Sequence, residues 1–174
     1  SDTVVLNTCN SRFVQFEQVS EEEVNKLITS SPSKSSKLDC LPTWLMKTHI
    51  DAFISFITHV INCSFTSAVF PKYMGRALIT PVLKKPSLDS NDFSNYRPVS
   101  NINFISKIIE KVASNQLKDY LCKNNLIDMY QSAYVSNRST ETALLKVKSD
   151  VLNAVDRQEV VFLVMLDLSA AFDT

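Results

Sequence analysis

One carboxylate stands at a position that suits chemistry. The residues from Val160 to Leu166 form a continuous apolar run rich in β-branched side chains, and the next residue is Asp167. Such a run predicts a central strand buried on both faces. A carboxylate at the end of a core strand is costly to desolvate unless a metal ion or a basic group pairs with it. A helix cap after the strand explains Asp167 equally well, so both interpretations stay open.

The basic residues gather in the middle of the chain. The whole sequence has 18 basic and 18 acidic residues, but residues 72–148 hold twelve basic against six acidic, a net charge of +6. Residues 149–174 hold one against five, a net charge of −4. A basic segment followed by an acidic one is typical of a polyanion-binding surface beside a cation site. Chance clustering of solvated side chains would give the same counts.

Glycine is nearly absent, and this excludes several kinds of nucleotide site. The 174 residues contain one glycine, Gly75, where about a dozen would be usual. Sites that cradle phosphates with glycine-rich loops are therefore excluded. Backbone positions that need a positive φ must be filled by Asn or Asp, or avoided.

The four cysteines, Cys9, Cys40, Cys63 and Cys122, are far apart and include no CxxC pair. With two histidines beside them, they have no recognisable zinc-site spacing. We expect buried free thiols, which fit a reducing compartment. No secretory signal is visible at the amino end, although a fragment could have lost one. The expected location is intracellular, in nucleus or cytoplasm.

The elements that would position these residues are mostly helical. A capping box at Ser20 predicts a short helix, and further helices are expected around 42–47, over 50–66, from 103 to 124 and from about 139. Residues 52–70 contain no Asp, Glu, Lys or Arg, but the helix over 50–66 is amphipathic, so it is interpreted as a buried helix and not as a membrane span. Residues 76–83, interrupted by Pro81, predict an edge strand paired with residues 96–99. The predicted class is α+β, with helices packed on a small antiparallel sheet.

Five motifs in order carry a family resemblance. They are residues 70–86 (FPKYMGRALITPVLKKP), 95–100 (NYRPVS), 106–111 (SKIIEK), 131–144 (QSAY followed by RSTETAL) and 167–174 (DLSAAFDT). In sequence and spacing they resemble the reverse transcriptases of non-LTR, LINE-type retrotransposons, closest to jockey- and CR1-like elements. The resemblance covers roughly residues 38–174. It implies the fingers and the first part of the palm of a right-hand polymerase.

The resemblance implies roles for the last motif. Enzymes of this kind use two divalent ions, here Mg²⁺, at the attacking and leaving oxygens. Asp167 matches the metal-binding aspartate, and the Leu168 carbonyl is a further ligand. The Ala170 and Ala171 amides would lie by the triphosphate. Phe172 matches the side chain that occupies the space of a ribose 2′-hydroxyl, although a plain core aromatic is the alternative.

The resemblance also implies roles for residues of the fingers. Arg97, Lys84 and Lys85 fit a hairpin that closes over the incoming nucleotide, where cations offset phosphate charge. A surface salt bridge is the alternative for Arg97, and a solvated turn for either lysine. Gln131 and Arg138 would help to place template or primer, but a structural hydrogen bond or a charge at a helix start explains them as well.

The chain also departs from the family. Two usual glycines are replaced by Leu38 and Cys40 around Asp39, and a third by Ala133. The second palm motif, an aromatic-x-Asp-Asp hairpin, is absent. We therefore expect a piece of a longer protein that does not polymerise DNA by itself.

Residues 1–37 are predicted to form a helical extension and linker, residues 38–158 the fingers, and residues 159–174 the start of the palm. The chain is predicted to be a fragment of an RNA-directed DNA polymerase whose partners are an RNA template, a DNA primer and deoxynucleoside triphosphates, with no membrane. The alternative is a decayed or domesticated remnant that binds nucleic acid or protein without catalysis.

Overall fold

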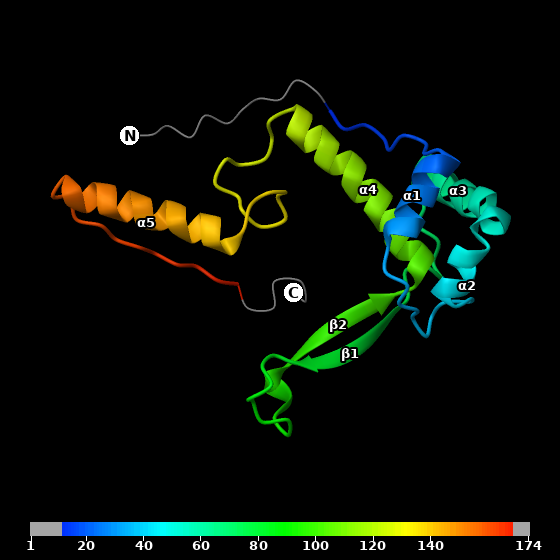
Figure 1. The fold of residues 1–174 in the computed structure, drawn as a ribbon, viewed down its shortest axis with the longest axis horizontal. Helices are drawn as coiled ribbons and strands as arrows, with labels where there is room; N and C mark the ends of the chain where they lie inside the picture. Colours follow the sequence, from blue (N-terminus) through cyan, green and yellow to red (C-terminus); the bar gives the residue numbers. More distant parts are fainter. Residues whose placement is uncertain (1–11, 169–174) are drawn as a thin grey trace. The chain divides into compact units, whose positions relative to one another are not determined.

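The computed structural model describes residues 12–168. These residues form two compact units that divide between Leu126 and Ile127. The first unit contains four helices and a two-stranded sheet, and the second contains one helix (Figure 1). The structure therefore mixes helices with a small antiparallel sheet.

The helices of the first unit pack on one another. They are α1 (Glu21–Ser30), α2 (Thr43–Thr48), α3 (Ile50–Ser67) and α4 (Phe104–Lys123). The capping box predicted at Ser20 is confirmed: its Oγ accepts a hydrogen bond from Glu23 N, and its own N donates to Glu23 Oε2. The core consists of apolar side chains from all four helices, namely Val24, Ile28, Met46, Ile54, Ile57, Ile61, Phe104, Ile108 and Ile109.

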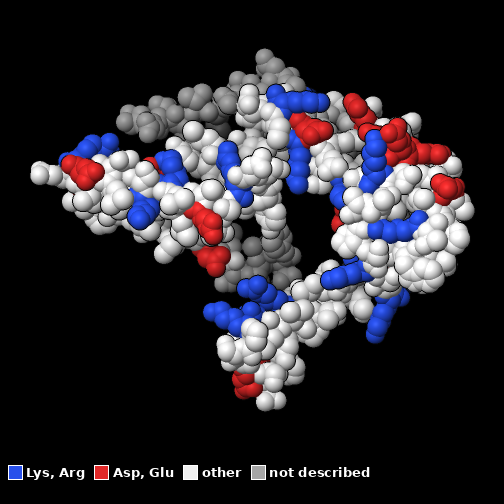
Figure 2. All heavy atoms as spheres, viewed as in Figure 1, with Lys and Arg blue, Asp and Glu red and all other residues white. Residues whose placement is uncertain are grey.

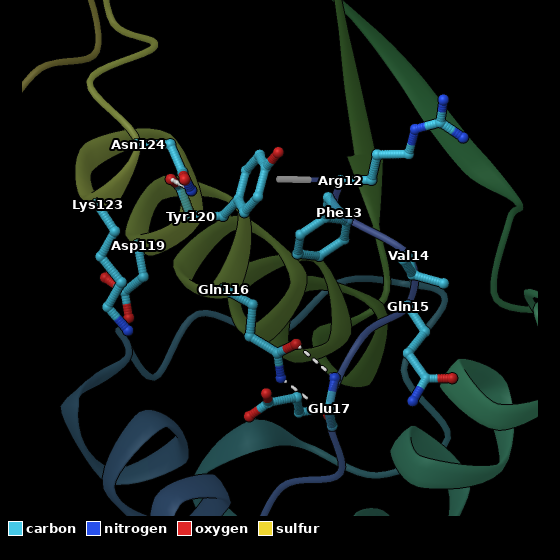
Figure 3. A pocket seen from close by; sticks show the side chains of 10 residues that line it. All are labelled: Arg12, Phe13, Val14, Gln15, Glu17, Gln116, Asp119, Tyr120, Lys123 and Asn124. Atoms are coloured by element: carbon cyan, nitrogen blue, oxygen red, sulfur yellow. Dashed lines mark hydrogen bonds between the residues drawn. The ribbon is translucent and has the colours of Figure 1, made fainter. Parts of the chain in front are cut away.

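An extended segment before α1 is held by two side-chain amides. Gln116 of α4 accepts from Glu17 N at 2.8 Å and donates to Glu17 O at 2.9 Å (Figure 3). Asn62 of α3 does the same for Val19, at 2.8 and 3.0 Å. Each carboxamide thus satisfies both polar groups of one backbone residue, as a neighbouring strand would. The segment and α1 both belong to the first unit.

The sheet is a hairpin of β1 (Ala77–Leu83) and β2 (Tyr96–Ile102), with a short 3-10 helix, η1 (Phe93–Asn95), in its loop. The strands are antiparallel, with Ala77 opposite Ile102 and Leu83 opposite Tyr96. Pro81 lies opposite Pro98. Since neither proline can donate, this pair belongs to the non-hydrogen-bonded positions, and both outer edges lose a donor. The edge strand predicted from Pro81 is confirmed.

The helices of the first unit do not pack on this sheet, which corrects one expectation. Side chains along both strands are mostly exposed, including those of Ile79 and Val99. In Figure 1 the hairpin projects from the helices of its own unit. A two-stranded ribbon with prolines on both edges offers too little apolar surface to seat a helix, so the helices bury their apolar faces against one another.

The second unit consists of a loop, α5 (Thr140–Asp156) and an extended tail. The predicted helix start is confirmed, because Ser139 and Thr142 form a reciprocal capping box. No residue of α5 is buried within the part of the chain that the structure describes.

The strand predicted over 160–166 is not formed. Residues 159–168 have no regular secondary structure, and Phe162 and Leu166 are 88% and 93% exposed. A central strand needs hydrogen-bonding neighbours on both edges. Within residues 12–168, the sheet consists of β1 and β2, which pair with each other and not with this segment.

Two residue-level expectations are corrected. Cys40, Cys63 and Cys122 are free but exposed; Cys63 lies on the polar side of α3, 3.4 Å from His59 Nε2. Cys9 lies outside the described residues. Positive φ angles occur at Asn125 and Asn137 as expected, but also at Ala68, Tyr134 and Gln158. No helix among the described residues is long and apolar enough to cross a membrane.

Candidate functional site

The basic residues predicted in the fingers lie where the hairpin strands meet their loop. Arg97 is opposite Val82, and Lys84 follows β1 directly, with its N donating to Asn95 O at 2.8 Å. Side chains alternate between the two faces of a strand, so this register places Lys84 and Arg97 on the same face of the ribbon. In Figure 2 the Lys and Arg side chains of the hairpin gather at this end, with Asp side chains farther along the loop.

The three cations differ in how they are engaged. Lys84 Nζ donates to Ser94 O at 2.7 Å, so its ammonium group braces the loop. Arg97 and Lys85 are exposed, and neither side chain has a hydrogen-bond or ion-pair partner within residues 12–168. The salt bridge weighed as an alternative for Arg97 is therefore not found there. Two unpaired cations on one ribbon end can bind an anion without first breaking a contact.

The hairpin loop is ordered by its aspartates. Asp92 Oδ1 accepts from Ser94 N at 2.8 Å and caps η1. Hydrogen bonds from Ser94 hold the pKa of Asp92 below its ordinary value, and the charge of Lys84 lowers it further. Asp89 Oδ1 accepts from Asn91 N at 2.9 Å. Both carboxylates therefore accept hydrogen bonds from backbone amides within the loop.

Gln131 and Arg138 lie in the loop before α5 in the second unit. Arg138 Nη1 donates to the carbonyl oxygens of Met129 at 2.7 Å and Gln131 at 2.5 Å. Gln131 Nε2 donates to Ala133 O at 3.3 Å. Arg138 therefore closes this loop on itself, which is the structural role that the sequence left open. Contact with template or primer stays a prediction.

The predicted palm residues are described only in part. Asp167 and Leu168 are exposed in the extended tail, and residues 12–168 contain no group of three His, Cys, Asp or Glu side chains that could hold a metal ion. Ala170, Ala171 and Phe172 lie outside the described residues. Their predicted roles remain untested.

The first unit also contains a cleft that the sequence analysis did not predict. A cleft of about 350 Å³ lies between the extended segment and α4 and is lined by both charge types, with Arg12, Glu17, Asp119 and Lys123 among its residues (Figure 3). None of the predicted site residues lines it. Its walls come from positions about a hundred residues apart, a pairing that no local pattern indicates.

Comparison with known proteins decides the family. The profile described as Reverse transcriptase (RNA-dependent DNA polymerase) matches residues 83–174, which is more than half of the chain. The chain belongs to the reverse transcriptase family. The resemblance inferred from the five motifs is confirmed, and the match includes Lys84, Lys85, Arg97 and Asp167.

Curated relatives in this family come from mobile elements. The chain is 26% identical over 153 residues to a probable RNA-directed DNA polymerase from transposon BS of Drosophila melanogaster, covering 87% of the chain. It is 26% identical over 156 residues to the RNA-directed DNA polymerase from mobile element jockey of Drosophila funebris, covering 89%. The chain spans 17% of the length of each relative. It therefore corresponds to one part of these polymerases.

Proposed function

We propose that the chain supplies the fingers and the first palm motif of a retrotransposon RNA-directed DNA polymerase. The parent reaction is templated addition of deoxynucleotides to a primer 3′-end. The observation that carries this proposal is the family match over residues 83–174, which contains two unpaired cations at the hairpin end and Asp167 at the end of an apolar run. Its substrates and template occur inside the cell, in nucleus or cytoplasm.

Each residue of the hairpin has a defined task in this proposal. Arg97 and Lys85 bind the triphosphate and neutralise charge that develops on it. Lys84 keeps the loop closed through Ser94. In the second unit, Gln131 and Arg138 shape the loop that faces template or primer.

The donor chemistry of the palm motif fits magnesium. Mg²⁺ prefers oxygen ligands and retains several waters, and Asp167 and Leu168 offer a carboxylate and a carbonyl oxygen. When bound, two such ions stabilise the attacking and leaving oxygens of phosphoryl transfer. The Ala170 and Ala171 amides orient the triphosphate, and the Phe172 ring excludes a 2′-hydroxyl by its size.

A chimera tests the proposal. Residues 83–174 would replace the matching segment of the Drosophila funebris jockey polymerase, and primer extension on an RNA template would be measured. We expect extension by the chimera, its loss in Asp167→Ala, and its retention in Asp156→Asn, which removes a carboxylate of α5. Extension by Asp167→Ala would refute the metal-ligand role.

Phe172→Val in the same chimera should raise incorporation of ribonucleotides. An unchanged ratio of deoxynucleotide to ribonucleotide incorporation would refute the size exclusion.

A second candidate function is a non-catalytic remnant that binds nucleic acid. It is favoured by Ala133, which replaces a family glycine, and by the positive φ angle of Tyr134 in the same loop. A left-handed backbone costs a non-glycine residue about 1–2 kcal/mol, so this loop carries strain. An inactive chimera beside an active jockey parent would support the remnant.

A further inference from the structure

The base of the hairpin holds a set of polar contacts that the proposed function does not use. β1 is entered from Met74, and β2 leads through Asn103 into α4. Since the strand side chains are exposed, no packed face fixes the direction of the hairpin. A two-stranded hairpin is marginally stable by itself in water. Its order and direction must therefore be set where the chain enters and leaves it.

The first contact comes from a distant loop. Asp39 Oδ1 accepts a hydrogen bond from Phe104 N at 2.6 Å. Phe104 begins α4, so its N–H has no partner within the helix, and a carboxylate there also meets the positive end of the helix dipole. Asp39 is itself fixed, because its Oδ2 accepts from Ser36 N at 2.5 Å and its N donates to Ser36 O at 3.1 Å.

The second contact joins the entry of the hairpin to the same helix. Ser106 is fully buried, and its Oγ lies 2.8 Å from Met74 O and 2.8 Å from Asn103 Oδ1. Asn103 is also buried, and its Oδ1 accepts from Ser106 N at 2.8 Å. The hydroxyl can donate its one proton to the Met74 carbonyl because Asn103 already receives the amide proton. The strand entry and the strand exit thus meet on one turn of α4.

We propose that Asp39, Asn103 and Ser106 form a base clamp that holds the hairpin in the direction in which it presents Arg97 to a triphosphate. These are positioning residues, since they lie at the opposite end of the strands from Arg97. That Arg97 meets a triphosphate rests on the proposed function. That these three residues fix the direction of the hairpin rests on their contacts alone.

Hydrogen exchange resolved to single amides of the 174-residue chain tests the clamp. In Ser106→Ala and Asp39→Ala we expect exchange in the hairpin to rise about fivefold to tenfold, the effect of losing one hydrogen bond. The rise should be largest at Leu78 and Asn101, the hydrogen-bonded pair nearest the base, and decline toward Val82 and Arg97, with α3 unchanged. Asp39→Asn keeps the acceptor for Phe104 N and should behave closer to the wild type, which guards against a variant that fails to fold.

Ser64→Ala is the matched control. Ser64 is also buried, and its Oγ donates to a backbone carbonyl, that of Val69, at 2.8 Å. It should leave hairpin exchange unchanged. Unaltered hairpin protection in both clamp variants, or an equal rise across α3 and the hairpin, would overturn the clamp.

Binding of a fluorescent deoxynucleoside triphosphate separates the two proposals. Weaker binding by Asp39→Ala and Ser106→Ala, restored in Asp39→Asn, supports the positioning role. Equal binding by wild type and clamp variants overturns that role. If the wild type binds no triphosphate while the exchange pattern appears as expected, the clamp is supported and the proposed function of the hairpin fails.

Discussion

At the residue scale, Arg97 is the side chain on which triphosphate binding should depend most. It is exposed and has no ion-pair or hydrogen-bond partner among residues 12–168, and a guanidinium group can hold two phosphate oxygens at once. We expect Arg97→Ala to weaken triphosphate binding about tenfold or more, with partial recovery in Arg97→Lys. Equilibrium titration with a fluorescent triphosphate measures this.

The control for Arg97 is Arg157→Ala. Arg157 also is an exposed arginine, but it pairs with Glu159 at 3.1 Å. Arg157→Ala removes the same charge from the chain as Arg97→Ala, and it should leave the affinity for the triphosphate unchanged. Equal losses in both variants would mean that net charge, and not the hairpin end, attracts the ligand.

Asp92 should make the hairpin loop sensitive to acid. Hydrogen bonds from Ser94, and then the charge of Lys84, lower the pKa of Asp92. A carboxyl with a lowered pKa stabilises the folded state above its ordinary pKa of about 3.9, and this contribution is lost as pH falls through the lowered value. The protection of the Ser94 amide, taken as its exchange rate relative to the intrinsic rate at the same pH, should therefore fall below about pH 4. Asp92→Asn should abolish this dependence, and an unchanged profile in that variant would contradict the assignment.

At the scale of elements, the sequence was sufficient to predict an element where the contacts that start it are local. The helix starts at Ser20 and Ser139 follow from side chains within three residues, and the structure confirms both. The strand over 160–166 could not be settled locally, because a strand exists only with a partner. Asp39 and Phe104 are 65 residues apart, so the base clamp has no sequence pattern either.

The end of α3 offers a test of the backbone. Ala68 caps this helix in the left-handed region with φ 53°, where glycine is favoured. Gly75, in contrast, has no positive φ, and an added Cβ would meet its nearest neighbour at 3.7 Å. We expect Ala68→Gly to raise the free energy of unfolding by about 0.5–1 kcal/mol.

Gly75→Ala is the complementary variant. It places a methyl group at ordinary van der Waals distance from its neighbours and reduces the freedom of the unfolded chain, so it should be neutral or stabilising by up to about 1 kcal/mol. Denaturant unfolding measures both variants. Destabilisation by Ala68→Gly would show that Ala68 contributes more through its methyl group than its backbone costs.

At the scale of the whole molecule, the charge distribution predicts a salt-sensitive interaction with RNA. Residues 72–148 carry a net charge of +6 although the complete chain is neutral. Binding that releases counterions weakens as salt rises, and the affinity falls by about twentyfold between 50 and 200 mM when about three phosphates are neutralised on a single strand. Filter binding or anisotropy with single-stranded RNA measures this.

Two lysine variants locate the contact with RNA. Lys85→Ala should make the salt dependence less steep by about one phosphate contact. Lys26→Ala, which removes a lysine of α1 paired with Glu22 at 2.7 Å, should not change it. Affinity that does not respond to salt would contradict an electrostatic origin.

The apolar tail should govern self-association of the chain. Phe162, Met165 and Leu166 are each at least 85% exposed, and a contiguous exposed apolar segment with β-branched residues favours association between chains. We expect Phe162→Lys with Met165→Lys to lower self-association in light scattering and to reduce binding of an apolar dye. Unfolding of the first unit should be unchanged, because its core lies in four other helices. Asn153→Lys adds a charge on exposed α5 and removes no apolar surface, so it should have little effect. If Asn153→Lys reduced association as strongly, charge repulsion and not the apolar tail would be the cause.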